Sequence, residues 1–416
     1  MNEIERLQAD CVIVGAGPAG ATSALLLARA GLDVLLIDRA VFPRRKPCGD
    51  SISPQANLLL EQLGVLSAIE AAHPARVQGW RITAPSGGSF DARFADAVSD
   101  QRITTGFALS RDKLDAILLD AARAAGARVL TGVAVEDVLQ ANGCVVGVRA
   151  RHGADPIEIS APLTVGADGL QSVVRRKLHL LARKPRLRKV ALTAHVTSPL
   201  DISDYGELHV LADACVGLSA VDERRAVSNV TLVLAAERYG RTVAGKSFES
   251  FWAHVNRFPR LRGRFTQCEP VDELMASGPF DQPTRAAVVP GAALVGDAAG
   301  YFDPFTGQGI YQALAGGMLL ADAASAALHG GRAHEALHDY ARGLTALVNA
   351  PRRVQRGIEL VVARPRLADR CINALAHAPS AASALIAVTG DVKPPRSLLS
   401  AEPLITFLRH FARSAA

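Results

Sequence analysis

Apolar residues form two short uninterrupted runs near the start of the chain, at positions 11–14 and 34–37. Between these runs, apolar residues recur at helical spacing until Gly31, and the second run closes at Asp38. Short continuous apolar runs are typical of strands buried in a parallel sheet, and two of them joined by a helix form a β-α-β unit. The pattern therefore predicts two parallel strands and a connecting helix.

The turn between the first strand and the helix reads GAGPAG, which places Gly15, Gly17 and Gly20 in the spacing G-x-G-x-x-G. The first glycine permits a tight turn, the second lets a pyrophosphate approach the backbone, and the third lets helix and strand pack closely. Free N–H groups at the helix start attract phosphate, and Asp38 can accept hydrogen bonds from a ribose. We predict a dinucleotide site, although this motif does not distinguish FAD from NAD and a glycine turn without ligand is the alternative.

Strand and helix patterns continue through the first half of the chain. A helical pattern begins at Ser110 and ends at Gly126, and a strand pattern follows over residues 127–138. Asn142 and Gly143 then predict a hairpin turn.

A glycine-rich turn returns late in the chain, in GDAAGYFDPFTGQGI at positions 296–310. The apolar run at 292–296 predicts a buried strand, and Asp297 follows at its carboxyl end, where α/β sheets place ligand-binding groups. The turn at 307–309 leads into a helical pattern. Free N–H groups at that helix start would stabilise a ring that becomes anionic on reduction.

Composition excludes several classes of protein. Hydrophobic residues make up 49% and charged residues 21%, as in ordinary globular proteins. The net charge is +6, and only seven of the 46 basic residues are lysine; without a dense basic run we expect no nucleic-acid binding. Six cysteines show no metal or disulfide spacing, the N-terminus is polar, and no uncharged apolar run reaches the roughly 18 residues of a membrane span. We expect a cytoplasmic protein.

One further motif points to different chemistry. HEALH at positions 334–338 matches H-E-x-x-H, in which two histidines on one helix face bind zinc and the glutamate acts as base. The surrounding spacing instead turns Ala336, Leu337, Tyr340 and Leu344 inward and the histidines outward. We therefore expect a surface helix and no metal, with a zinc hydrolase as the alternative.

Taken together, GAGPAG with Asp38, GADG at 166–169 and GD at 296–297 resemble the FAD-dependent oxidoreductases of the para-hydroxybenzoate hydroxylase fold. RKPCGDSISP, GDAAGYFDPFTGQGI and the segment 361–399 resemble the geranylgeranyl reductase branch most closely. The resemblance implies an α/β fold with three parts. These are a discontinuous Rossmann-like FAD-binding domain (1–75, 106–185, 286–330), an antiparallel-sheet substrate domain (76–105, 186–285) and a helical C-terminal region (331–416).

The resemblance also implies the cofactor contacts. The first glycine turn would hold the pyrophosphate, Asp38 the adenosine ribose, Asp297 the ribitol, and backbone N–H groups of 307–310 the flavin ring. Cys48 would lie near the flavin, as the candidate catalytic proton source. The full cofactor set implied is Gly15, Gly17, Pro18, Ala19, Gly20, Asp38, Arg39, Arg45, Cys48, Gly49, Arg111, Val135, Asp168, Gly296, Asp297, Gly307, Gln308, Gly309 and Ile310.

For function, the resemblance implies that NAD(P)H or another donor reduces FAD, which then reduces a C=C bond of a polyene-, isoprenoid- or polyketide-like substrate. Oxygen activation and hydroxylation is the alternative; a non-catalytic flavin protein is a minor one. The segment 214–222 lacks the aromatic stretch ending in Phe-Pro that lines the lipid pocket of geranylgeranyl reductases. A halogenase would need a Trp-x-Trp motif and a lysine after the second helix, and neither is present. The apolar, arginine-rich C-terminal region could contact a membrane surface or a protein, or pack onto the body.

Overall fold

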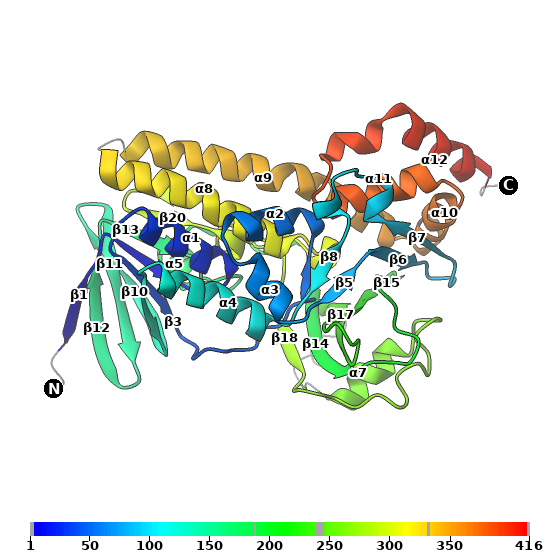
Figure 1. Ribbon diagram of the computed structural model, residues 1–416, viewed down its shortest axis with the longest axis horizontal. Helices are drawn as coiled ribbons and strands as arrows, with labels where there is room; N and C mark the ends of the chain where they lie inside the picture. The colour runs from blue at the N-terminus through cyan, green and yellow to red at the C-terminus, as the bar shows by residue number, and fades with distance from the viewer. Residues whose placement is uncertain (1–3, 187–188, 238–244, 246, 331–332, 414–416) are drawn as a thin grey trace.

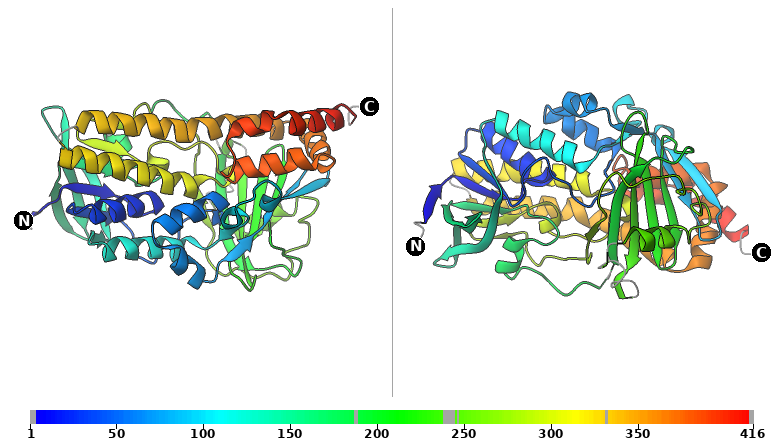
Figure 2. Two further views of the ribbon diagram at one scale, coloured as in Figure 1. Left: turned by 45° about the horizontal axis from the view of Figure 1, so that its top comes forward. Right: turned by 90° about the horizontal axis from the view of Figure 1, so that it is seen from below.

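The computed structural model describes residues 4–186, 189–237, 245, 247–330 and 333–413. The molecule is elongated, with the N-terminus and the C-terminus at opposite ends of its long axis (Figure 1). Two sheet-based halves lie side by side along this axis. The long helix α8 (Gly309–Gly330) lies over the half that contains the N-terminus, and α9 (Ala333–Val362) runs beside it and continues toward the other half (Figure 2).

A six-stranded sheet forms the centre of the half that contains the N-terminus. Its order is β19-β20-β13-β2-β3-β9, and every neighbouring pair is parallel except β19 with β20. The strands are β2 (Cys11–Val14), β3 (Val34–Asp38), β9 (Arg128–Thr131), β13 (Leu163–Gly166), β19 (Val288–Val289) and β20 (Ala292–Leu294). The strands predicted from the apolar runs are confirmed.

Alternate residues of the central strands face different layers. Cys11 and Ile13 belong to the core formed with helices α1 (Pro18–Arg29), α4 (Arg111–Ala124) and α8 (Gly309–Gly330). Val12 and Val14 pack instead against the second sheet, β1 (Glu5–Gln8), β12 (Asp155–Ser160), β11 (Cys144–His152) and β10 (Val133–Ala141). Burial on both faces explains why these strands are uniformly apolar.

The predicted hairpin turn is confirmed between β10 and β11. Asn142 and Gly143 both have positive φ, of 52° and 76°. This conformation matches the twist of two antiparallel strands, and asparagine and glycine adopt it at low cost.

A seven-stranded sheet forms the other half, in the order β18-β14-β17-β16-β15-β6-β7. Its strands are β6 (Gly79–Thr83), β7 (Ser89–Arg93), β14 (Lys189–Thr197), β15 (Tyr205–Leu211), β16 (Ala214–Ala220), β17 (Val227–Ala235) and β18 (Met275–Ser277). The prediction of a purely antiparallel sheet needs one correction, because β6 and β15 pair in parallel. These two strands come from distant chain segments, so no hairpin forces them to run in opposite directions. A small antiparallel sheet joins the halves, formed by β4 (Ser51–Ile52), β8 (Gly106–Ala108) and β5 (Ala75–Val77).

Both faces of the seven-stranded sheet are covered. Val230, Leu232 and Leu234 of β17 pack against helix α7 (Phe248–Val255) and the turns that follow it. On the other face, Phe90 and Ala92 of β7 pack against the C-terminal helices.

The C-terminal region is helical, as predicted. It comprises α9 (Ala333–Val362), α10 (Pro365–Ala376), α11 (Pro379–Thr389), the short 3₁₀ helix η5 (Pro395–Leu399) and α12 (Ala401–Arg413). Further helices among the described residues are α2 (Pro54–Gln62), α3 (Leu66–Ala71) and α5 (Val173–Lys177), with 3₁₀ turns η1 (Phe94–Asp96), η2 (Gln101–Ile103), η3 (Gly296–Ala298) and η4 (Pro304–Thr306).

Within the described ranges, no single helix is long and apolar enough to cross a membrane. One sharply bent pair, α10 with α11, passes the length and composition test together.

Candidate flavin and substrate site

The turn between β2 and α1 is built so tightly that two of its glycines cannot be replaced without movement. Gly15 has φ of +104°, and a Cβ there would lie 2.5 Å from the carbonyl oxygen of Ala167. A Cβ on Gly20 would lie 1.9 Å from the carbonyl oxygen of Gly15. Both glycines therefore serve packing.

Gly17 differs from these two glycines, because an added Cβ would meet no atom closer than ordinary van der Waals distance. Its φ is −75°, and the nearest atoms to an added Cβ are guanidinium nitrogens of Arg44 at 3.7 Å and Arg111 at 3.8 Å. The residue lies at the N-terminus of α1, where backbone N–H groups are unpaired. A cradle between two cations and a helix start suits a pyrophosphate.

The buried carboxylate of Asp115 contacts both guanidinium groups. Arg111 donates two hydrogen bonds of 2.8 Å to Asp115, and Arg44 approaches the same carboxylate at 2.9 Å. Arg44 also lies 4.0 Å from the Asp38 carboxylate, so the cradle holds two guanidinium groups close to two carboxylates. The sequence indicated Arg111 but not Arg44, because the loop 44–46 reads like any solvated basic loop.

The three basic side chains of this loop point in different directions. Arg44 faces the cradle, and Lys46 lines the adjacent cavity. Arg45 points to the other half of the molecule, where its guanidinium meets the Asp272 carboxylate at 2.5 Å and the Glu273 carbonyl at 3.0 Å. Of Arg44 and Arg45, Arg44 is therefore the residue that lies in position to contact a phosphate.

Asp38 lies at the end of β3, directly beside the glycine turn. Its Oδ2 accepts a hydrogen bond of 2.8 Å from the N–H of Ala16, and its Oδ1 accepts one of 2.8 Å from the N–H of Ala40. These bonds hold the carboxylate in a fixed orientation. Arg39, the next residue, is exposed.

A cavity of about 180 Å³ opens from the cradle toward the seven-stranded sheet. It brings together eleven residues of the predicted cofactor set: Gly17, Pro18, Ala19, Cys48, Gly49, Arg111, Gly296, Asp297, Gly307, Gly309 and Ile310. Thr193 and Thr231 of the seven-stranded sheet line it as well, and no sequence motif indicated them. Segments separated by almost 300 residues thus meet around one space.

Three other members of the predicted set stand outside this lining. Val135 is half-buried in β10. Asp168 accepts a hydrogen bond of 2.6 Å from the N–H of Val173, at the start of α5. Gln308 is buried and binds the C-terminal region, through Asp391 at 2.5 Å and the Val388 carbonyl at 3.3 Å. The structure gives these residues local structural roles, and their cofactor contacts stay predictions.

The late glycine turn enters helix α8 beside the cavity. Gly307 has φ of +69°, and α8 begins at Gly309 with its N-terminal N–H groups at the cavity wall. Unpaired N–H groups at a helix start stabilise a neighbouring negative charge. The turn can therefore stabilise a ring that becomes anionic on reduction.

Cys48 lines the same cavity, in the loop that precedes β4. Its Sγ accepts a hydrogen bond of 3.4 Å from the N–H of Asp50. Burial raises the pKa of the Cys48 thiol, so the sulfur carries its proton at neutral pH. This agrees with a proton donor, and its part in catalysis stays a prediction.

A buried polar cluster fixes the Cys48 loop to the seven-stranded sheet. His195 Nε2 lies 2.6 Å from Asp50 Oδ2, and His195 Nδ1 lies 2.5 Å from Asp272 Oδ2. Asn229 donates hydrogen bonds of 2.7 Å to both the Cys48 carbonyl and Asp50 Oδ2. No local signal indicated this cluster, because its members are dispersed along the sequence.

Hydrogen bonding makes His195 a cation in this cluster. Burial lowers the pKa of His195, but the hydrogen bonds to Asp272 and Asp50 outweigh it and raise the pKa to about 9. The imidazolium donates a hydrogen bond from each ring nitrogen, and its positive charge lies between the two carboxylates.

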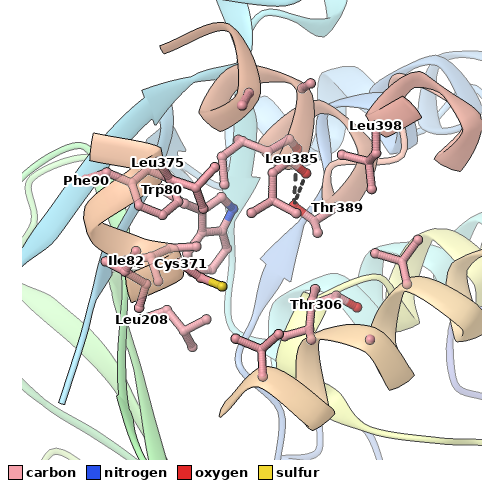
Figure 3. Close-up of a pocket in the computed structure, with 18 of the residues that line it drawn as sticks. Trp80, Ile82, Phe90, Leu208, Thr306, Cys371, Leu375, Leu385, Thr389 and Leu398 are labelled. Atoms are coloured by element: carbon pink, nitrogen blue, oxygen red, sulfur yellow. Dashed lines mark hydrogen bonds between the residues drawn. The ribbon is translucent and has the colours of Figure 1, made fainter. Parts of the chain in front are cut away.

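A second cavity, of about 430 Å³, lies between the seven-stranded sheet and the C-terminal helices (Figure 3). Trp80, Ile82 and Phe90 line it from β6 and β7, and Leu208 lines it from β15. Helices α9 to α12 form the opposite wall. Phe305 and Thr306 of η4 also line it, so this cavity borders the turn that leads to the flavin site.

Segment 214–222, which lies mostly in β16 and lacks the aromatic stretch, contributes no residue to this lining. The aromatic walls come from Trp80, Phe90, Phe305 and Phe407 instead. Only the tertiary structure brings these four residues together.

The HEALH segment forms the start of α9. Leu337, Tyr340 and Leu344 are buried and His338 is exposed, as predicted for a surface helix. The side chain of His334 lies outside the described residues. Among those that the structure describes, no group of three His, Cys, Asp or Glu residues could hold a metal ion.

A family model described as an FAD binding domain matches residues 8–350. The chain belongs to this FAD-binding family. The dinucleotide that the glycine motif left open is therefore FAD, and the protein is an FAD-dependent oxidoreductase. The residues fit the cofactor, since the Gly17 cradle, the Arg111 guanidinium and the start of α8 line one cavity, and the Arg44 guanidinium lies beside Gly17.

Several characterised members of the FAD-binding family are similar along most of the chain. A digeranylgeranylglycerophospholipid reductase of Methanothrix thermoacetophila is 28% identical over 377 residues, which cover 89% of this chain and 91% of that protein. The menaquinone reductase of Mycolicibacterium smegmatis is 30% identical over 331 residues, or 76% of each chain. The flavin-dependent brominase Bmp2 has a similar fold, with a TM-score of 0.80 over 98% of this chain and 99% of that chain at 19% identity. The resemblance predicted from the sequence motifs is thus confirmed.

Proposed function

We propose that the protein reduces a C=C bond of a hydrophobic polyene-, isoprenoid- or polyketide-like substrate. NAD(P)H or another two-electron donor would supply the electrons through FAD. The observation that carries the proposal is the apolar cavity, which shares Phe305 and Thr306 with the turn beside the flavin site.

The walls of this cavity select for apolar ligands. None of the residues that line it is charged, and its polar groups are few, among them the hydroxyls of Thr306 and Thr389. Its volume of about 430 Å³ falls in the range of small-molecule sites. An extended hydrocarbon ligand gains free energy by leaving water for such a space, whereas a charged ligand would lose hydration without compensation.

Relatives in the family support reduction. Two of them are named as reductases, of a digeranylgeranylglycerophospholipid and of menaquinone. The absence from the sequence of the Trp-x-Trp motif and of a lysine between Lys46 and Lys113 argues against halogenation.

Reduction of a C=C bond adds two electrons and two protons. FAD, when bound, supplies the electron transfer between donor and substrate. The chain positions the cofactor through the Gly17 cradle and the start of α8. The protonated Cys48 thiol holds a proton at the wall of the flavin cavity, and a water molecule is the alternative source.

Anaerobic stopped-flow absorbance tests the proposal. Flavin in the purified protein is reduced with NADH, NADPH or dithionite and then mixed with candidate polyenes, or with aerated buffer alone. We expect polyene to reoxidise the flavin without oxygen. A transient species that appears only with oxygen, together with a hydroxylated product, would instead establish a monooxygenase.

A cavity variant connects this reaction to the proposed pocket. Cys371 of α10 points into the cavity (Figure 3). Cys371→Phe should slow polyene-dependent reoxidation by roughly tenfold or more, because the ring occupies space that the substrate needs. Cys371→Ala is the matched control and should leave the rate near that of the unmodified protein. Equal rates for both variants would place the substrate elsewhere.

A further inference from the structure

The outer surface of the C-terminal region exposes an unusual number of large aliphatic side chains. Leu399 of η5 is 73% exposed, and Ile405 and Leu408 of α12 are 56% and 52% exposed. Leu360 of α9 is 59% exposed, and η5 packs against α9. We call Leu360, Leu399, Leu404, Ile405 and Leu408 the aliphatic face.

Three residues of the aliphatic face belong to α12, and they expose their side chains to solvent. Leu408 is four residues from Leu404 and three from Ile405, so its side chain neighbours both of them on the helix surface. The opposite side carries Pro403 and Phe407, which line the apolar cavity. No residue of α12 is fully buried, so the helix lies on the surface of the protein with apolar groups on two sides.

Exposed basic residues accompany the aliphatic face in the same part of the chain. Lys393, Arg396, Arg409 and Arg413 are all exposed. Between residues 392 and 413, Glu402 is the only acidic residue. An amphipathic helix with aliphatic residues on one face and flanking arginines is typical of binding at an anionic membrane surface.

The aliphatic face and the apolar cavity share a wall. Leu404 belongs to both, being 36% exposed to solvent and part of the cavity lining. Leu398, the neighbour of exposed Leu399, also lines the cavity. Figure 1 places α12 at the outer edge of the molecule, at the end opposite the N-terminus.

From these observations we infer that η5 and α12 bind the surface of an anionic phospholipid bilayer, which brings the wall of the apolar cavity against the membrane. The inference extends the proposed function, since a hydrophobic substrate would then enter from the bilayer and not from water. The aliphatic side chains insert among the acyl chains, and the four basic residues contact lipid phosphates.

Vesicle sedimentation of the full-length holoprotein tests the inference. Vesicles of phosphatidylcholine alone are compared with vesicles that also contain phosphatidylglycerol. We expect binding to the anionic vesicles, weakening as salt screens the charges over a Debye length of about 8 Å at physiological ionic strength. Protein that stays in the supernatant with both vesicles would overturn the inference.

Matched variants assign the binding to the aliphatic face. The double variant Ile405→Ser/Leu408→Ser should weaken vesicle binding by roughly 10- to 100-fold, because two aliphatic side chains no longer leave water. The control Leu200→Ser/Val271→Ser changes two side chains that are 100% and 53% exposed elsewhere, and should bind like the unmodified protein. Equal binding by both doubles would overturn the inference.

Two further results separate the alternatives. If the unmodified protein is a dimer that Ile405→Ser/Leu408→Ser dissociates, the face joins two copies and the membrane inference is wrong. The failure of the proposed function looks different: the protein would bind anionic vesicles but reduce no polyene. If both hold, the double variant should reduce a detergent-solubilised polyene at the normal rate and lose activity only on vesicle-embedded substrate.

Discussion

At the scale of single residues, Gly17 and Gly20 show how one motif serves two purposes. A Cβ at Gly20 collides with backbone, whereas a Cβ at Gly17 would meet two guanidinium groups at ordinary van der Waals distance. Gly20 is thus needed for the fold, and the surroundings of Gly17 agree with the predicted approach of a pyrophosphate to the backbone.

We therefore predict that Gly17→Ala and Gly20→Ala fail in different ways. Gly17→Ala should fold with a nearly unchanged thermal midpoint but bind FAD at least roughly tenfold more weakly, because the methyl group occupies the pyrophosphate position. Gly20→Ala should lower the free energy of unfolding by about 1–3 kcal/mol, since backbone must move. Flavin fluorescence titration and thermal unfolding measure the two effects. Normal FAD affinity in Gly17→Ala would contradict the assignment of the cradle.

At the scale of elements, the C-terminal helices are connected directly to the turn beside the flavin. Gln308 in that turn binds Asp391, which follows α11, and Gln355 of α9 donates a hydrogen bond of 2.7 Å to Thr306. The region that forms one wall of the apolar cavity also supports the turn that enters α8.

Asp391 makes this connection sensitive to pH. Burial raises the pKa of the Asp391 carboxyl to about 7, although the hydrogen bonds to Gln308 and Ser53 act to lower it. An acid whose folded-state pKa exceeds its unfolded value of about 3.9 costs stability as the pH rises from about 4 to about 7. Asp391→Asn should then raise the free energy of unfolding at pH 8 by roughly 1–3 kcal/mol and change it little at pH 4.

Denaturant unfolding at the two pH values measures this difference. The left-handed backbone at position 391, with φ of 63°, suits asparagine as well as aspartate. Exposed Asp339→Asn is the control and should shift stability equally little at both pH values. A destabilised Asp391→Asn protein at pH 8 would show that the charged form stabilises the fold.

At the scale of the whole molecule, the two sheet-based halves meet at the His195 cluster. Asp50 comes from the loop beside the flavin site, His195 and Asn229 come from β14 and β17, and Asp272 precedes β18. Arg45 adds a positive charge against Asp272. The protonation of one imidazole therefore strengthens the contact between the halves.

The pH dependence of stability should report this contact. The pKa of His195 is raised from its ordinary value to about 9 in the folded protein. The protonated imidazole stabilises the folded protein by an amount with an upper limit on the order of 3 kcal/mol. This stabilisation is fully present below the unfolded pKa of about 6.5 and is lost as the pH rises to about 9. The variant His195→Gln lacks this stabilisation. Its thermal midpoint should therefore fall less than that of the unmodified protein as the pH rises from about 6.5 to about 9. An equal decline in both proteins would contradict the charged imidazolium.

Units formed by residues near each other in the chain follow from local patterns. Apolar periodicity and glycine sterics made the β2–α1–β3 unit and the Asn142-Gly143 hairpin predictable, whereas the helical C-terminal region was implied by the family resemblance. Arg44 and the His195 cluster were not predictable, since their roles depend on partners far away in sequence.

The position and the walls of the apolar cavity follow from how distant elements pack. Strands β6, β7 and β15, the turn at 304–306 and helices α9 to α12 each contribute a few side chains that look like ordinary core residues in sequence. A cavity is the space left when distant elements pack, and that space follows from their relative placement, which no local pattern encodes. The sequence indicated a dinucleotide site, and the packing of the C-terminal helices places an apolar cavity against the turn at 304–306.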